Sequence, residues 1–120
     1  MRPLKERDIA AYLVKRVGEL SGICRKMSWE GRSDAPDYLV MLNGDFAFVE
    51  TKAPTGKPRP SQLREFSTIE THAGETVAVV RAPDDVDTLL CGFRNSESLA
   101  VALERLTYRR FLNGNAGKKP

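Results

Sequence analysis

Apolar residues are concentrated near the middle of the chain, on both sides of a short polar break. Residues 36–52 read PDYLVMLNGDFAFVETK, and the dipeptide Asn43-Gly44 separates two apolar runs. Asn-Gly between apolar runs is the strongest short-range signal for a two-residue hairpin turn. The pattern predicts two antiparallel strands that join at this turn, with charged residues at the open end of the hairpin.

The remaining periodicity predicts further helices and strands. Apolar residues spaced by four indicate a helix at Ile9, Leu13 and Val17, whereas residues 76–81 (TVAVVR) are largely β-branched and have no polar face. The expected order is a helix at 3–20, a strand at 23–29, the hairpin, a helix at 61–72, a strand at 76–81 and helices at 83–91 and 96–112. This order predicts an α/β sandwich, with helices on the faces of one mixed sheet of about four strands.

The hairpin turn also determines which residues face each other. With Asn43 and Gly44 in the turn, the pairing extends to Asp37 opposite Glu50, and opposed Cβ atoms lie about 4.5–5.5 Å apart. Side chains alternate along a strand, so Glu50 and Lys52 share a face. Both faces of the hairpin are apolar, which predicts a place in the middle of the sheet, with the charged group at the rim of a covered region. A β-bulge would shift this register by one residue.

Two facing carboxylates require neutralisation, and the residues leave two hypotheses open. One is a buried ion cluster that includes Lys52, and the other is a divalent-cation site. Glu6, expected beside the buried edge of the first helix, would add a third carboxylate, and Thr51 would add a backbone carbonyl. The cation-rich segment 57–64 follows directly and suits a phosphate-bearing substrate. Together these features favour metal-assisted phosphodiester hydrolysis.

Composition narrows the class of protein. The 120 residues are 41% hydrophobic, which is enough for the core of one domain; we expect that domain at 1–112 and a flexible tail at 113–120. Two distant cysteines and one histidine argue against a Cys/His zinc site and a disulfide scaffold. The sequence shows no leader-like segment and no apolar run long enough for a membrane span, so we expect a cytoplasmic protein.

The open end of the hairpin resembles a nuclease signature. Pro36-Asp37 and Glu50-Thr51-Lys52 match the PD-(D/E)XK pattern. The surrounding segments GRSDAPDYLVML, FAFVETKAP and RPSQLREFSTIETHAGETVAVVRAPDDVD resemble the virus-type replication-repair nuclease (VRR-NUC) branch of that superfamily, over about residues 1–95. Gln62 stands where that branch carries a glutamine at the start of the next helix. Ala35 stands where glycine is usual, a departure that affects the expected loop and not the ligands.

The resemblance implies a restriction-endonuclease-like fold and cleavage of DNA with Mg²⁺, for which Mn²⁺ would substitute. It implies Asp37, Glu50, the Thr51 carbonyl and, through water, Glu6 as metal ligands, and Asp37, Glu50, Lys52, Glu6 and Gln62 as the catalytic set. DNA contacts are expected from Lys57, Arg59, Arg64 and Arg32.

Stand-alone members of the branch resemble phage proteins that cut four-way (Holliday) junctions as homodimers, whereas members fused to other domains cut flaps or branched ends. The length of this chain favours the stand-alone type, in a bacterial or phage-infected cell.

Each assignment has a structural alternative. Gln62 would be a solvated residue of the first helical turn, and Glu6 would be favoured at a helix N-terminus by the helix dipole. His72, near a helix C-terminus, is best interpreted as a surface or capping residue. For the whole protein, the alternatives are a non-catalytic nucleic-acid-binding module and a purely structural acidic cluster.

Overall fold

The elements follow the order that the sequence predicts. The computed structural model describes residues 2–112, so the expected tail at 113–120 lies outside the described residues. The elements are α1 (Glu6–Glu19), β1 (Ile23–Lys26), β2 (Tyr38–Leu42), β3 (Asp45–Thr51), α2 (Pro60–Ala73), β4 (Val77–Val80), α3 (Pro83–Gly92), α4 (Ser96–Leu106) and the 3₁₀ helix η1 (Tyr108–Phe111). None of the helices in the described part is long and apolar enough to cross a membrane.

The strands form one mixed sheet in the order β1-β2-β3-β4. The first two neighbouring pairs are antiparallel, and β3 pairs with β4 in parallel. Pairing in the hairpin runs without a bulge from Leu42 opposite Asp45 to Tyr38 opposite Val49. Asn43 and Gly44 both have positive φ, at 53° and 82°, which a two-residue hairpin turn of type I′ requires. The predicted register is therefore confirmed.

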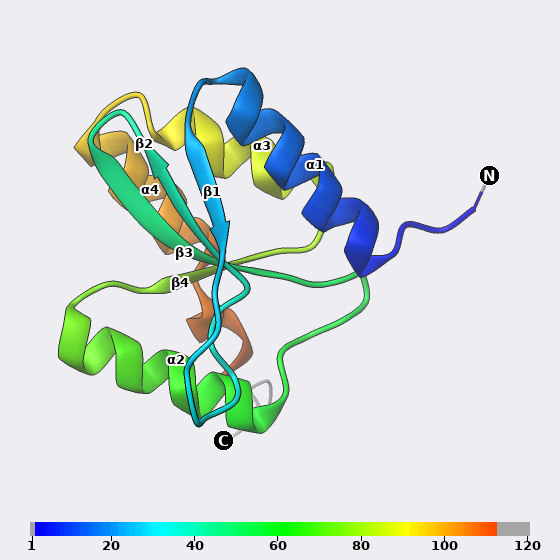
Figure 1. Ribbon diagram of the computed structural model, residues 1–120, viewed down its shortest axis with the longest axis vertical. Helices are drawn as coiled ribbons and strands as arrows, with labels where there is room; N and C mark the ends of the chain where they lie inside the picture. Colours follow the sequence, from blue (N-terminus) through cyan, green and yellow to red (C-terminus); the bar gives the residue numbers. More distant parts are fainter. Residues whose placement is uncertain (1, 113–120) are drawn as a thin grey trace, which may run out of the picture.

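One face of the sheet is fully covered, and we call it the α1 face. Helices α1 and α3 lie side by side against it (Figure 1), and α4 packs on α3 and β4. Its core combines the α1 stripe predicted from the sequence with inward residues of the sheet and of the C-terminal helices. The main contributors are Ile9, Leu13, Val17, Val40, Ala47, Val49, Ala78, Val80, Leu89 and Phe93, all of them buried. This face supplies most of the apolar burial that stabilises the fold.

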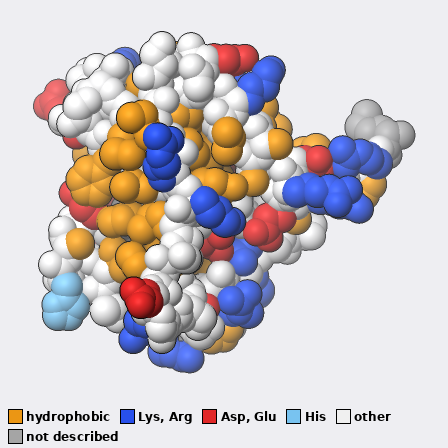
Figure 2. Space-filling model, viewed as in Figure 1, with side chains coloured by type: hydrophobic (Ala, Val, Ile, Leu, Met, Phe, Trp, Pro, Cys, Tyr) orange, Lys and Arg blue, Asp and Glu red, His pale blue; other side chains and the backbone are white. Residues whose placement is uncertain are grey.

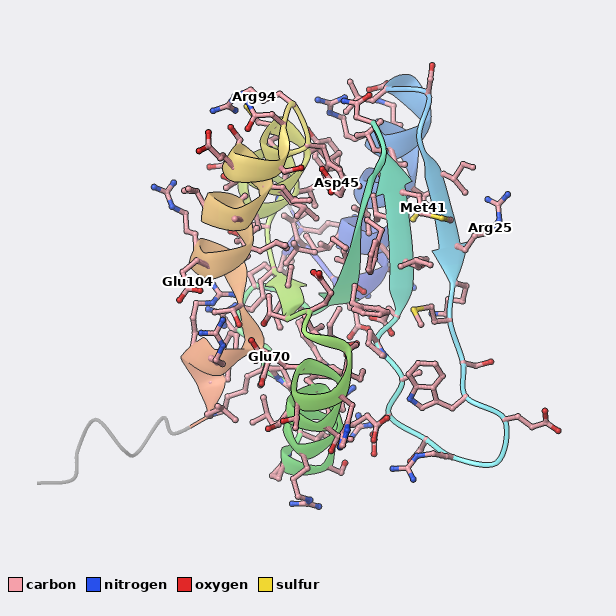
Figure 3. All side chains as sticks on the ribbon, turned by 90° about the vertical axis from the view of Figure 1, so that its left-hand side faces the viewer. Arg25, Met41, Asp45, Glu70, Arg94 and Glu104 are labelled. Carbon is pink, nitrogen blue, oxygen red and sulfur yellow. The ribbon has the colours of Figure 1, made fainter. Side chains whose placement is uncertain are left out.

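The opposite face, the α2 face, is covered only in part. Helix α2 and η1 bury Phe66, Val77, Val79 and Tyr108 over β4 and the adjacent end of β3. Toward the hairpin turn the strands are open, and Phe46 remains 41% exposed. Figure 2 shows hydrophobic side chains gathered over the strands, and in Figure 3 the labelled Met41 lies on this uncovered part, above α2. The sequence predicted that both faces of the hairpin are covered. On the α2 face this prediction is wrong for the part of the hairpin near the turn.

Three predicted boundaries differ from the structure by three residues or more. The first helix begins at Glu6 and not at Pro3, because Lys5 is extended and its amide donates to the Asp8 carboxylate. The helix expected at 96–112 ends at Leu106, because Thr107 is extended and forms a bridge to β4. The strand expected at 23–29 ends at Lys26, and the loop that follows turns toward α2.

Candidate active site

The two carboxylates predicted to face each other come together at the end of the hairpin opposite the turn. Glu50 lies near the end of β3, and Asp37 directly precedes β2. The backbone amide of Asp37 donates to Glu50 Oε1 at 3.1 Å. The pairing of β2 with β3 begins at the neighbouring residues, Tyr38 and Val49. This pairing holds the side chains of Glu50 and Asp37 at the same rim of the sheet. The apolar hairpin acts as the support for this group.

Glu50 is almost completely buried, with 1% of its surface exposed. Burial raises the pKa of Glu50 to about 7, and the charge of Asp37 acts in the same direction, although Lys52 and the Asp37 amide oppose it. A carboxylate with this pKa is half-protonated near neutral pH. A proton or a nearby cation such as the Lys52 ammonium lowers the cost of burying this carboxylate.

Lys52 and Gln62 both approach the second oxygen of Glu50. The Lys52 ammonium lies 3.3 Å from Glu50 Oε2, and the Gln62 amide nitrogen donates to the same oxygen at 2.8 Å. The Gln62 amide oxygen accepts from the backbone of Arg59 at 2.8 Å, so the first turn of α2 fixes the orientation of the amide. Gln62 is buried, and its interpretation as a solvated first-turn residue is wrong.

Asp37 has partners that the sequence pattern did not indicate. Its Oδ2 atom accepts hydrogen bonds from the Thr51 amide at 2.9 Å and from the Thr51 hydroxyl at 2.8 Å. The Lys26 ammonium lies 4.0 Å from Oδ1 and 5.0 Å from the centre of the Tyr38 ring. Lys26 pairs with Tyr38 across β1 and β2, but the long loop between these strands hides that register in the sequence.

The structure does not bring Glu6 to this pair. Glu6 is exposed in the first turn of α1, and within residues 2–112 no three His, Cys, Asp or Glu side chains gather closely enough to hold one metal ion. Glu6 was expected on or beside the buried edge of the first helix, but its side chain is exposed. Its role as a ligand through water stays a prediction. Two carboxylates still suit Mg²⁺, which commonly uses one or two carboxylates together with water and substrate phosphate oxygens. The Thr51 carbonyl as a further ligand stays a prediction.

The expected DNA-contacting cations differ in their surroundings. Arg32 pairs with Glu65 at 2.9 Å and Arg59 pairs with Asp34 at 3.1 Å, although both arginine side chains remain about two-thirds exposed. Lys57 and Arg64 are exposed and form no ion pair within residues 2–112. Arg32 lies on the loop before Asp37, Lys57 and Arg59 lie between β3 and α2, and Arg64 lies in α2 beside Leu112. Contact of these cations with DNA stays a prediction.

The loop that leads from β1 to Asp37 is attached to α2. The Trp29 indole donates to Glu65 Oε2 at 2.8 Å, while Arg32 binds the other oxygen of the same carboxylate. On the other side of the site, the Arg81 guanidinium donates to the carbonyl of Gly56 at 3.0 Å. These contacts fix both loops next to the site, and a sequence pattern could not pair residues so far apart. His72 is exposed in the last turn of α2, which agrees with a surface or capping role.

Comparisons with known proteins agree with this geometry. No family model matches the chain. A solved structure described as a VRR_NUC domain matches with a TM-score of 0.64 and 41% sequence identity, over 71% of this chain and 92% of that chain. The curated "Putative nuclease p44" of Acyrthosiphon pisum secondary endosymbiont phage 1 is 47% identical over 68 residues, which are 56% of this chain and 73% of that protein.

Proposed function

The chain belongs to the VRR-NUC family of nuclease domains, and we propose that it hydrolyses phosphodiester bonds in DNA with Mg²⁺ or Mn²⁺. The observation that carries this proposal is the group formed by Asp37, Glu50 and Lys52, in which a buried carboxylate with a pKa of about 7 faces a second carboxylate and a lysine. A buried carboxylate beside a second carboxylate costs stability unless a cation compensates its charge. Catalysis would give this costly arrangement a function.

The side chains take distinct roles in this proposal. Asp37 and Glu50 would hold the cation, which, when bound, would polarise a phosphate oxygen and favour hydroxide formation from water. Lys52 would stabilise negative charge on the phosphate or orient the attacking water. Gln62 orients the Glu50 carboxylate and limits its rotation.

The basic residues beside the site support a polyanionic substrate. Lys57 and Arg64 are exposed and without ion-pair partners in the described part of the chain, so their charges would be available to DNA phosphates. Such contacts position the backbone and do not read sequence. Replacing either residue by alanine would weaken binding with little dependence on sequence and reduce the salt dependence by about one ion.

Within this activity, we favour cleavage of four-way (Holliday) junctions by a homodimer. Symmetric cleavage of a two-fold junction needs two active sites related by a two-fold axis, and a homodimer provides them. Flap or branched-end cleavage is the alternative substrate class. Measurement of the mass in solution tests the dimer separately from the activity.

The experiment for the activity compares labelled four-way junction, flap and linear duplex, each with and without Mg²⁺. We expect Mg²⁺-dependent cleavage, with the junction cut fastest, and no cleavage by Glu50→Ala. Glu97→Ala is the matched control, because Glu97 is an exposed glutamate in the first turn of α4. Absence of cleavage of all three substrates by the wild-type protein would overturn the proposal.

A non-catalytic DNA-binding module is the second candidate, and the basic residues near the site also fit it. It predicts salt-sensitive binding of DNA that does not depend on Asp37 or Glu50. Binding of a labelled junction without Mg²⁺, compared between the wild-type protein and Glu50→Ala, measures this property. Equal binding together with no cleavage by the wild-type protein would favour the module.

A further inference from the structure

The two oxygens of the Asp37 carboxylate have unequal partners. Oδ2 accepts two hydrogen bonds from one residue, from the Thr51 amide at 2.9 Å and the Thr51 hydroxyl at 2.8 Å. Among the described residues, Oδ1 accepts no hydrogen bond, and its one ion-pair partner is the Lys26 ammonium, at 4.0 Å. Two donors that converge on one oxygen restrict rotation of the carboxylate. Oδ1 thus remains the oxygen that is open to a ligand.

Thr51 is a rigid support for this contact. Its surface is 1% exposed, and it pairs with Val80 in the parallel ladder between β3 and β4. Strand alternation places its side chain on the α1 face, opposite that of Glu50, and Asp37 reaches it at the open end of the hairpin. The Thr51 hydroxyl therefore contacts Asp37 and is separate from Lys52 and Gln62, which contact the Glu50 carboxylate.

We propose that the Thr51 hydroxyl is a positioning residue, which fixes Asp37 so that its free oxygen can bind the divalent cation. This inference rests on the proposed function and goes beyond the expected role of Thr51, which concerned its backbone carbonyl. Residues that hold a metal ligand in place commonly contribute about 10–100-fold to metal affinity or activity. The buried hydroxyl would be a specific part of the site and not only a satisfied core group.

The test compares Thr51→Val with Thr51→Ser. Valine keeps the shape and the backbone carbonyl but removes the hydroxyl, whereas serine keeps the hydroxyl. Thr76→Val is the matched control, because Thr76 is also buried and its hydroxyl lies 2.6 Å from that of Thr107, away from the site. The readouts are the Mn²⁺ dissociation constant by calorimetry, kcat and KM for cleavage, and the melting temperature.

We expect Thr51→Val to weaken Mn²⁺ binding about tenfold and to lower kcat with little change in the KM for DNA. Thr51→Ser should stay within about threefold of the wild type, and Thr76→Val should lose stability but not Mn²⁺ affinity. Equal affinity of the wild type and Thr51→Val would overturn the inference, as would equal losses in the serine and valine variants. If the wild type itself binds no Mn²⁺, the proposed function fails and the inference fails with it.

Discussion

The two faces of the sheet differ in what they bury. The α1 face buries apolar side chains beneath α1, α3 and α4, and its strand residues Val40, Val49 and Val80 are completely inaccessible. The α2 face buries Glu50 as deeply as these valines, yet leaves Phe46 exposed at the other end of the same strand. Burial therefore has a different effect on each face of the sheet. On the α1 face it stabilises the fold, and on the α2 face it changes the chemistry of a carboxylate.

Glu50→Gln tests the α2 face most strongly. Glutamine keeps the size of the side chain but removes the negative charge, so we expect cleavage to fall at least about 10³-fold, because a cation site contributes several kcal/mol to the transition state. The initial rate of Mg²⁺-dependent cleavage measures this effect. A rate within tenfold of the wild type would show that the buried charge has no role in catalysis.

Leu13→Ala makes the corresponding change beneath the α1 face. Leu13 is fully buried, so its truncation should lower the free energy of unfolding by about 2–5 kcal/mol through lost burial and a residual cavity. Urea unfolding measures the change. The Mn²⁺ affinity of the folded fraction should remain that of the wild type, and a tenfold loss of affinity would contradict the separation of the two faces.

The pH dependence of stability should reveal the cost of the buried carboxylate. The pKa of Glu50 is about 7 in the folded protein and about 4.5 when unfolded, so the folded state binds more protons between these values. Protonated Glu50 contributes to the free energy of unfolding. This contribution is fully present below pH 4.5 and is lost as the pH rises to 7. The loss is on the order of 3 kcal/mol.

Comparison of the wild type with Glu50→Gln isolates this effect from other titrating groups. The variant mimics the protonated acid, so the two proteins should have similar free energies of unfolding at pH 5, and the variant should be more stable at pH 8. Urea unfolding at both pH values, without metal, measures the difference. A variant that is less stable than the wild type at pH 8 would show that the ion pair with Lys52 outweighs the cost of burial.

Phe46→Ser should have the smallest effect. Phe46 lies on the open part of the α2 face and is 41% exposed, so the substitution should lower the free energy of unfolding by less than about 1 kcal/mol. Thermal unfolding measures it, with Leu13→Ala as the buried counterpart. A loss as large as that of Leu13→Ala would mean that another molecule covers this part of the face under the conditions of the measurement.

The sequence predicted the site where local rules decide the geometry. Asn43-Gly44 specified the hairpin turn, and the turn specified that Asp37 meets Glu50. The family resemblance placed Gln62, which composition alone would have left in solvent. These predictions needed no knowledge of how distant segments pack.

Where packing decides, the sequence was insufficient. Lys26 lies beside Asp37 because of the register between β1 and β2. The loop that joins these two strands has no periodic signal, so the sequence does not reveal that register. The Thr51 hydroxyl contacts Asp37 only because this carboxylate lies at the open end of the hairpin. There the side chains no longer alternate strictly between the two faces of the sheet. Glu6 was expected near the site because of its position along the first helix. In the first turn of α1 that position does not determine burial, and Glu6 is exposed.

Calorimetric titration with Mn²⁺ at pH 8 tests the central claim most directly. The claim is that Asp37 and Glu50 together hold a divalent cation, so the wild-type protein should bind Mn²⁺ and Asp37→Asn should bind it at least about tenfold more weakly. Both proteins should unfold cooperatively, which excludes loss of the fold as the cause. Undetectable binding by the wild type, or equal binding by Asp37→Asn, would contradict the account and leave the carboxylates as a structural cluster.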